Sequence, residues 1–277
     1  MLKSILIGLD GSAYSDVAVE LGIQWAKRFD ALLVGLGIVD QPTICKPEPV
    51  PLGGGVYKKE RDDLLLAEGR RKVREFLDQF EARSAAAGIA YQAIEDVGLP
   101  YLEILRESHR YDLVLLGHET HFHFETTDEA DETLWHVLRS ESRPVVVAPA
   151  QLHPGSSVVV AYNASPQADR ALQAFQTSGL DCGDEVHLVC VDEDEAVAIR
   201  EAGRGVEFLR PHGIRAVAVG RQPNGSIAAT ILDEARARQA RLLVMGACGH
   251  SRLRQVLLGS VTKQTLRSSP VPVFLCD

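Results

Sequence analysis

Short apolar runs alternate along the chain with longer amphipathic stretches in which apolar residues recur every three to four positions. Such runs are typical of strands buried on both faces of a parallel sheet, and the amphipathic stretches are typical of the helices that cover it. In the first half of the chain, the pattern predicts strands near 4–9, 32–38, 90–95, 112–117 and 144–148, and helices near 13–29, 60–87, 99–109 and 131–141. In the second half, it predicts strands near 157–162, 185–191, 214–219, 241–246 and 272–276, and helices near 166–178, 194–210, 225–239 and 260–268.

The second half of the chain repeats the first. Three segments have counterparts, namely 5–12 with 158–165, 112–117 with 241–246, and 138–147 with 266–275. The period of about 130 residues is the size of a domain, so this is a tandem duplication and not a solenoid. A linker falls near 149–157. We therefore expect two domains, 1–150 and 151–277, each a five-stranded, doubly wound α/β domain with a parallel, Rossmann-like sheet.

A glycine-rich segment follows the strand expected near 241–246. From Gly246 to Thr262 it reads G-x2-G-x9-G-S-V-T, and the final glycine and serine begin an amphipathic stretch. Glycines let backbone N–H groups approach a phosphate without a Cβ in the way, and a helix N-terminus favours negative charge. The segment therefore predicts a phosphate site; the alternative is a strand-to-helix turn without a ligand.

Charge supports the phosphate interpretation. Residues 247–269 contain four cations, Arg252, Arg254, Lys263 and Arg267, and no carboxylate. Arg252 and Arg254 lie inside the nine-residue gap, where they either reach phosphate oxygens or belong to a solvated loop.

Composition narrows the class of protein. The formal net charge of −9 argues against nucleic acid as the main partner. No apolar run approaches the roughly 20 residues needed to span a bilayer, so we expect no membrane association. The five cysteines are scattered and lack C-x-x-C spacing, which is typical of reduced thiols in the cytoplasm.

The two halves differ in charge at the matching position. Residues 1–150 hold 25 acids and 16 bases, whereas residues 151–277 hold 13 of each. Asp131 and Glu132 stand where the second half has Gly259 and Ser260, and carboxylates at a helix N-terminus repel a phosphate. We therefore expect the first half to have lost the phosphate loop.

The pattern G-x2-G-x9-G-S-V-T, followed by a helix and a final strand that begins Pro-Val-Pro-Val, resembles the nucleotide loop of the universal stress protein family, ATP-binding branch. The resemblance implies a tandem member of this family: a cytoplasmic, adenine-nucleotide-binding regulatory protein of the stress response. The ligand would be ATP, AMP or ADP, held at one site in the second half. The first half would be a degenerate partner in an internal pseudo-dimer.

By this resemblance, the nucleotide-binding residues are Asn163, Ala164, Ser165, Val191, Gly246, Gly249, His250, Arg252, Gly259, Ser260, Val261 and Thr262. Val191 would offer its backbone to the adenine. ATP-binding relatives have an aspartate at the position of Asn163, as the first half has at Asp10. Asn163 can bond a ribose hydroxyl but brings no charge to a cation, which leaves open whether magnesium is required.

Two functions from other classes compete with nucleotide-dependent regulation. One is a slow ATP hydrolase or nucleotidyl-transfer enzyme that uses the same pocket, although His250 is the only titratable candidate for a base between the glycines. The other is a nucleotide-free interaction scaffold, which is favoured if Asn163 abolishes binding. We expect no catalytic residues and no metal ligands.

Two further segments of the first half allow two interpretations each. His118, His121, His123 and His136 either form a flexible polar loop or ligate zinc together with nearby acids. The proline- and glycine-rich residues 41–59 form either a mobile surface loop or a functional element, a lid over a cleft or a partner-binding arm.

The final strands of the two halves, 144–148 and 272–276, are apolar and begin with proline, a residue tolerated at a strand start or sheet edge. Two unprotected apolar edges in one chain would favour aggregation. We therefore expect these strands to pair antiparallel within the chain, as the resemblance also implies. A homodimer of the whole chain is a further possibility.

Overall fold

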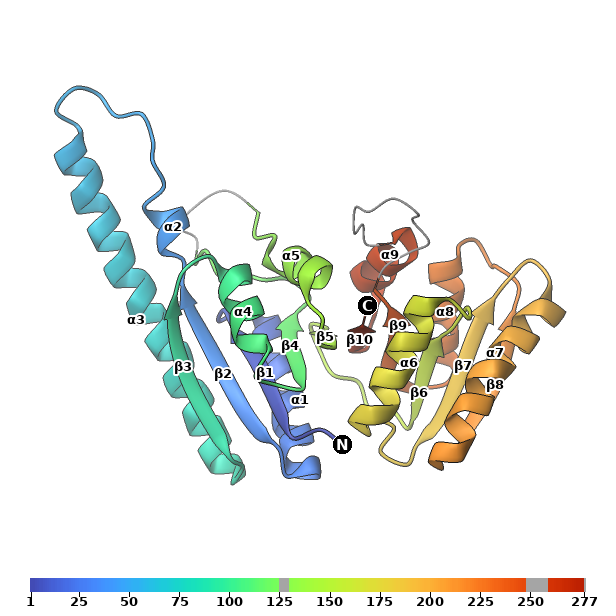
Figure 1. Ribbon diagram of the computed structural model, residues 1–277. Helices are drawn as coiled ribbons and strands as arrows, with labels where there is room; N and C mark the ends of the chain where they lie inside the picture. The colour runs from blue at the N-terminus through green and yellow to red at the C-terminus, as the bar shows by residue number, and fades with distance from the viewer. Residues whose placement is uncertain (125–129, 248–258, 277) are drawn as a thin grey trace. The chain divides into compact units, whose positions relative to one another are not determined.

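The computed structural model describes residues 1–124, 130–247 and 259–276 (Figure 1). The chain divides into two compact units. One contains Lys3–Val137, and the other contains Leu138–Asp277 together with Met1–Leu2. Each unit is a mostly parallel sheet with helices packed against it, as the alternation of apolar runs predicts.

The unit of Lys3–Val137 contains a four-stranded parallel sheet in the order β3-β2-β1-β4. Its strands are β1 (Ser4–Leu9), β2 (Leu32–Val39), β3 (Tyr91–Val97) and β4 (Leu113–Gly117). Its helices are α1 (Ala13–Phe29), α2 (Gln41–Ile44), α3 (Gly55–Ala87) and α4 (Pro100–Ser108), and α5 (Thr133–Ser140) continues into the other unit.

The unit of Leu138–Asp277 contains six strands in the order β5-β10-β9-β6-β7-β8. They are β5 (Val145–Ala148), β6 (Ser157–Ala161), β7 (Glu185–Val191), β8 (Ala216–Arg221), β9 (Ala240–Gly246) and β10 (Val273–Cys276). The helices are α6 (Pro166–Ser178), α7 (Glu195–Leu209), α8 (Ile227–Ala237) and α9 (Ser260–Ser268), with a short 3-10 helix, η1 (Arg210–His212), after α7. Strand order reverses between β6 and β9, which is where ligands of such sheets bind.

The final strands of the two repeats pair antiparallel, so this prediction is confirmed. Phe274 of β10 lies opposite Val146 of β5, and Val273 lies opposite Val147. Both strands are buried along their whole length, and Phe274 packs edge-on against Phe175 of α6. Because of this pairing, β5 belongs to the same compact unit as the second repeat.

The first helix of each repeat begins with a serine N-cap. Ser12 caps α1 by accepting a hydrogen bond from the N–H of Ser15, and Ser165 caps α6 by accepting one from Ala168. A serine at the N-cap satisfies one of the N–H groups that the first turn leaves unpaired. The serine-containing turns matched in the sequence are therefore equivalent in structure.

The segment 41–59 is more helical than expected. Residues Gln41–Ile44 form α2, with Asp40 capping its N-terminus through the N–H of Thr43 and Pro42 in the first turn. Helix α3 begins at Gly55 and not near residue 60, because the last proline of the segment is Pro51 and the residues after it can take helical geometry. α3 is long and mostly polar, and no helix in the described part of the chain is both long and apolar enough to cross a membrane.

Candidate functional site

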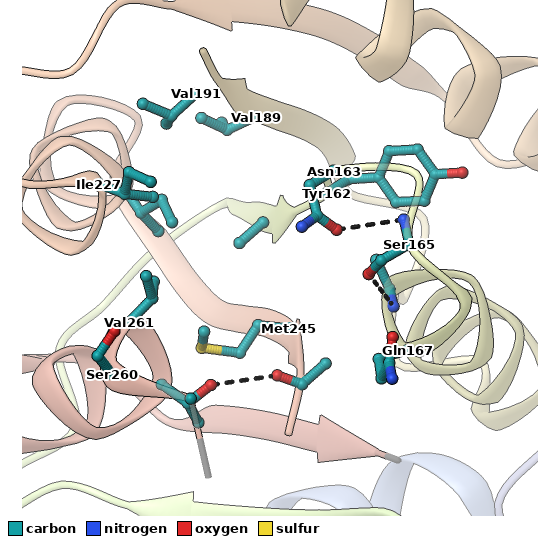
Figure 2. Close-up of a pocket in the computed structure, with 16 residues that line it drawn as sticks. Tyr162, Asn163, Ser165, Gln167, Val189, Val191, Ile227, Met245, Ser260 and Val261 are labelled. Carbon is teal, nitrogen blue, oxygen red and sulfur yellow. Dashed lines mark hydrogen bonds between the residues drawn. The ribbon is translucent and has the colours of Figure 1, made fainter. Parts of the chain in front are cut away.

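A cavity of about 350 Å³ opens in the unit of the second repeat, at the carboxyl ends of β6, β7 and β9 (Figure 2). This is the edge of the sheet at which the strand order reverses. Sixteen residues line the cavity: Ala161, Tyr162, Asn163, Ser165, Gln167, Ala168, Val189, Val191, Ile227, Ile231, Met245, Gly246, Gly259, Ser260, Val261 and Thr262.

Eight of the twelve residues predicted for the site line this one cavity: Asn163, Ser165, Val191, Gly246, Gly259, Ser260, Val261 and Thr262. Ala164 lies in the same turn as Asn163 with a left-handed φ of 50°, and it is not among the lining residues. Gly249, His250 and Arg252 lie outside the described residues, as does Arg254. The structure thus brings together three segments that are far apart in the sequence.

One side of the cavity is apolar. Figure 2 shows Val189 and Val191 of β7 near Ile227 of α8, with Met245 at the end of β9. Sequence reasoning named only Val191 among these four. Val189, Ile227 and Met245 have the apolar pattern expected of any buried strand or amphipathic helix, so the sequence does not distinguish them from core residues. Such a surface suits a flat, apolar group, which is the usual composition of a small-molecule site.

The opposite side is polar and comes from the turn after β6. The Oδ1 of Asn163 accepts a hydrogen bond from the N–H of Ser165 at 3.3 Å. Because the oxygen is used within the turn, the side-chain NH₂ group of Asn163 is left as a donor, and Figure 2 shows this turn on the cavity wall, across from Ile227 and Val261. The turn therefore presents a hydrogen-bond donor and no negative charge.

The N-terminus of α9 forms a third wall. Gly259 occupies the N-cap and has no side chain to cap the helix, and the first turn carries no acidic residue. The first N–H groups of a helix have no partner within it, and together with the helix dipole they attract anions. The hydroxyl of Thr262 lies 3.4 Å from the carbonyl oxygen of Gly246, which ties α9 to the end of β9. Gly246 and Ser260 therefore face the same space.

Tyr162 is the only titratable side chain among the described lining residues. Burial raises the pKa of Tyr162 above its ordinary value, and the hydrogen bond from its hydroxyl to Asp169 Oδ1, at 2.6 Å, raises it further. The phenol is therefore neutral, and it points toward Asp169. No carboxylate, histidine, lysine or arginine stands among the lining residues that the structure describes, so this wall offers no general base.

The corresponding region of the first repeat is occupied by side chains of the protein. Asp131 accepts hydrogen bonds from the N–H of Phe122 at 2.6 Å and from the N–H of Thr133, the first residue of α5, at 2.8 Å. Asp10 likewise accepts from the N–H of His121 at 2.7 Å, and burial raises the pKa of this carboxyl. Two carboxylates thus use the N–H groups that a phosphate would need.

Phe122 fills the space beside the strand ends of the first repeat. Its ring is fully buried, and a Cβ added at Gly8 would lie only 3.0 Å from it. Phe124 is also buried and packs against Phe76. Both aromatic residues therefore contribute to local packing.

The histidines of this segment make separate contacts. His123 Nδ1 lies 2.7 Å from Asp40 Oδ2, His136 stacks on Tyr101 with ring centroids 4.7 Å apart, and His118 lies beside Tyr14. Within the described residues, no three histidine, cysteine or acidic side chains are grouped as a metal site would need. Part of the segment, 125–129, lies outside them.

Comparison with known proteins gives the same fold over nearly the whole chain. Universal stress protein Slr1230 of Synechocystis sp. is 24% identical, over 99% of this chain and 99% of its own. The crystal structure of a universal stress protein from Archaeoglobus fulgidus has a TM-score of 0.69 at 22% identity, covering 99% of this chain and 96% of its own. A putative universal stress protein from Pseudomonas aeruginosa has a TM-score of 0.60 at 15% identity, covering 99% and 93%.

Most of the chain also matches a defined protein family. Residues 1–149 and 214–277 match the universal stress protein family, so both repeats contribute to it. These residues include β1 and Asp10 in the first repeat, and β9, Gly246 and all of α9 in the second. The chain belongs to the universal stress protein family.

Proposed function

We propose that this protein is a regulatory protein of the stress response that binds one adenine nucleotide, ATP, ADP or AMP, in the cavity of the second repeat. One observation carries the proposal: an apolar wall and an uncapped helix N-terminus face the same 350 Å³ space. A nucleotide combines a flat base with an anionic phosphate, and this cavity offers a surface for each. Family membership supports the stress-response role.

The geometry suggests how the nucleotide lies. The base would pack against Val189, Val191 and Ile227, and the NH₂ group of Asn163 would donate to an acceptor of the ribose. The phosphates would lie against Gly246 and the first turn of α9, where N–H groups and the hydroxyl of Ser260 donate. The roles of Gly249, His250 and Arg252 stay predictions from the sequence.

The first repeat supports a single site per chain. The carboxylates of Asp10 and Asp131 already accept the N–H groups at its strand and helix ends, and Phe122 fills the neighbouring space. A nucleotide phosphate would have to displace two negative charges there. The first repeat would therefore act as a partner for the second, the internal pseudo-dimer inferred from the sequence.

We place the protein in the cytoplasm, because its five cysteines are scattered and lack C-x-x-C spacing. Its role there would be regulatory and not catalytic, since the described wall of the cavity offers no general base. With excess ATP and Mg²⁺, we expect turnover far below the enzyme median of about 10 per second.

The test is made on the full chain, because a cut near residue 150 would separate β5 from its partner β10. Isothermal titration with ATP, ADP and AMP should give a stoichiometry of one. Mass spectrometry of the small molecules released when the purified protein is denatured should identify any nucleotide that co-purifies. Gly259→Asp should abolish binding, because it adds a negative charge where the phosphate must lie.

The matched control is Glu132→Ala, at the position of the first repeat that corresponds to Ser260. Glu132 is exposed, and its removal should leave both the affinity and the stoichiometry unchanged. Two nucleotides per chain, or full affinity in the Gly259→Asp variant, would show that the assignment of the site is wrong.

A further inference from the structure

The chain contains two asparagines, and both belong to loops at the cavity of the second repeat. Asn163 lines the cavity, and Asn224 lies between β8 and α8, shortly before the lining residue Ile227. Only Asn224 is followed by glycine. An asparagine in this position can react with its own main chain, because glycine has no Cβ to shield its nitrogen. The loop is therefore a candidate for a covalent change.

Asn224 begins a tight turn. The N–H of Ser226 donates to the carbonyl oxygen of Asn224 at 3.1 Å, and Gly225 between them has a φ of +77°. A hydrogen bond across one residue with this φ defines a γ-turn of the rare, strained kind. A Cβ added at Gly225 would meet no heavy atom within 4 Å, so the space around this residue is open.

The two groups that would react are exposed and unpaired. Both Asn224 and Gly225 are exposed, and within the described residues neither the Asn224 side-chain amide nor the Gly225 N–H has a hydrogen-bond partner. Other groups hold the loop: the N–H of Asn224 donates to the hydroxyl of Thr230 at 2.8 Å, and this hydroxyl donates to the carbonyl oxygen of Ser226. The turn is therefore kept in place without the use of either reacting group.

Asn163 is also exposed, but it lacks the other two conditions. Its Oδ1 accepts a hydrogen bond from the N–H of Ser165 at 3.3 Å, which holds the side-chain amide within the turn. The next residue is Ala164, whose Cβ shields the main-chain nitrogen that would attack. The fold therefore protects Asn163 and leaves Asn224 open to reaction.

We propose that Asn224 is a site of spontaneous deamidation in the folded protein. The nitrogen of Gly225 gives its proton to hydroxide and attacks Cγ of Asn224, and the side-chain nitrogen takes a proton from water and leaves as ammonia. The product of this step is a five-membered succinimide ring. Water then breaks one of the two bonds from the ring nitrogen to carbon: the bond to Cγ gives aspartate, and the bond to the main-chain carbonyl carbon gives isoaspartate. The net change consumes one water and releases one ammonia, and no oxidant is needed.

Deamidation changes the loop that leads into the cavity wall. Ile227 is the first residue of α8 and lies on the apolar side of the cavity (Figure 2). Both products add a negative charge before this helix. In isoaspartate the main chain also runs through the side-chain carbon, which lengthens the loop by one CH₂ group. Deamidation should therefore displace Ile227 and weaken nucleotide binding, a consequence that rests on the proposed function.

Peptide mapping of the full chain measures the reaction directly. After incubation at mildly alkaline pH, the tryptic peptide 222–236 should gain about 1 Da and separate into aspartyl and isoaspartyl forms. Its rate should lie within about threefold of the rate in a synthetic peptide spanning 221–229, because the fold leaves both reacting groups unpaired. Asn163 should react at least about tenfold more slowly in the folded chain than in a peptide of its own sequence.

Asn224→Gln is the matched control variant, because its longer side chain would have to close a six-membered ring, which is a much slower reaction. This variant should show no mass gain in the peptide 222–236 over the same period. Folded protein in which Asn224 reacts more than about tenfold more slowly than in the peptide would overturn the proposal, since the fold would then protect the loop. Equal protection of Asn224 and Asn163 would also overturn it.

Nucleotide titration tests the consequence for the cavity separately. Protein in which Asn224 has been converted should bind ATP at least about threefold more weakly than fresh protein, whereas Asn224→Gln should bind equally before and after the same incubation. Unchanged affinity after full conversion would overturn the link between this loop and the cavity. Fresh protein that binds no nucleotide would instead overturn the proposed function, and the mass measurement would still decide whether Asn224 is modified.

Discussion

At the turn after the first strand of each repeat, one side chain decides the local charge. Asp10 occupies this turn in the first repeat and Asn163 in the second, and each accepts a hydrogen bond from the serine two residues later. The backbone is therefore built in the same way in both turns. The two side chains differ in their second polar group. In Asp10 this group is Oδ2, which accepts a hydrogen bond from the N–H of His121, whereas in Asn163 it is an NH₂ group.

This difference predicts how nucleotide binding at the proposed site depends on metal. Asn163→Asp would bring a negative charge close to the bound nucleotide, so in the presence of EDTA we expect ATP to bind about tenfold more weakly. Added Mg²⁺ should restore the affinity, because the cation neutralises both the introduced carboxylate and the phosphates of ATP. Isothermal titration with and without Mg²⁺ measures the effect. The neutral variant Asn163→Ala serves as the control and should gain no such dependence; equal behaviour of the two variants would contradict the prediction.

His187 predicts a pH dependence of stability. It is buried at the start of β7, with Nδ1 3.1 Å from the Arg238 guanidinium. Burial lowers the pKa of His187, and Arg238 lowers it further. In the unfolded chain, a histidine takes up its proton near pH 6.5, so below about that pH the unfolded state binds more protons and the folded protein loses stability.

We therefore expect His187→Gln to reduce the loss of unfolding free energy between about pH 7.5 and about pH 5.5, even though the variant is less stable at neutral pH. Urea denaturation at a series of pH values measures this slope. His153→Gln is the control, because His153 is exposed. Identical slopes for the His187 variant and the unchanged protein would refute the prediction.

Among the elements, strands that are buried on both faces lie closest to the positions predicted from the sequence. β1 and β4 contain fully buried runs and lie within one residue of their predicted positions. Helices α1 and α6 begin where they were predicted, whereas α5 begins two residues later, because Asp131 accepts a hydrogen bond from the N–H of Thr133. Caps are decided by side-chain hydrogen bonds that the apolar pattern does not record.

The pairing of β5 with β10 makes Phe274 a central part of the core. Its ring is fully buried and packs edge-on against Phe175. Phe274→Ala should lower the free energy of unfolding by about 3–5 kcal/mol, since it leaves a cavity that the surrounding strands cannot fill. Urea denaturation measures the loss. Phe208→Ala on α7, where the ring is only partly buried, should cost clearly less, and an equal cost would argue against this role of Phe274.

At the scale of the whole molecule, duplication has produced two repeats with one fold and different chemistry. The second repeat keeps an open cavity between Asn163, Val191 and Gly259. The first repeat fills the matching place with Phe122 and Asp131. Strand β5 of the first repeat completes the sheet of the second, so the two repeats are not separable at the linker.

Local patterns in the sequence predict the fold class, the duplication and most of the polar residues that line the cavity. Apolar runs and turns are local signals, and the glycines and serine of the loop have a spacing that few other segments share. The sequence also predicts that the first repeat lacks the phosphate loop, since Asp131 and Glu132 carry charges that a phosphate would avoid.

Which apolar residues line a cavity and which fill the core depends on the packing of segments that are distant in the sequence. Val189, Ile227 and Met245 have the same pattern as core residues, and they differ only in what lies opposite them. The same holds for Tyr57 and Leu64, whose spacing resembles that of a buried helix face although both are exposed. Hydrophobic periodicity reports which side of an element is apolar, whereas the contacts across that side depend on segments distant in the sequence.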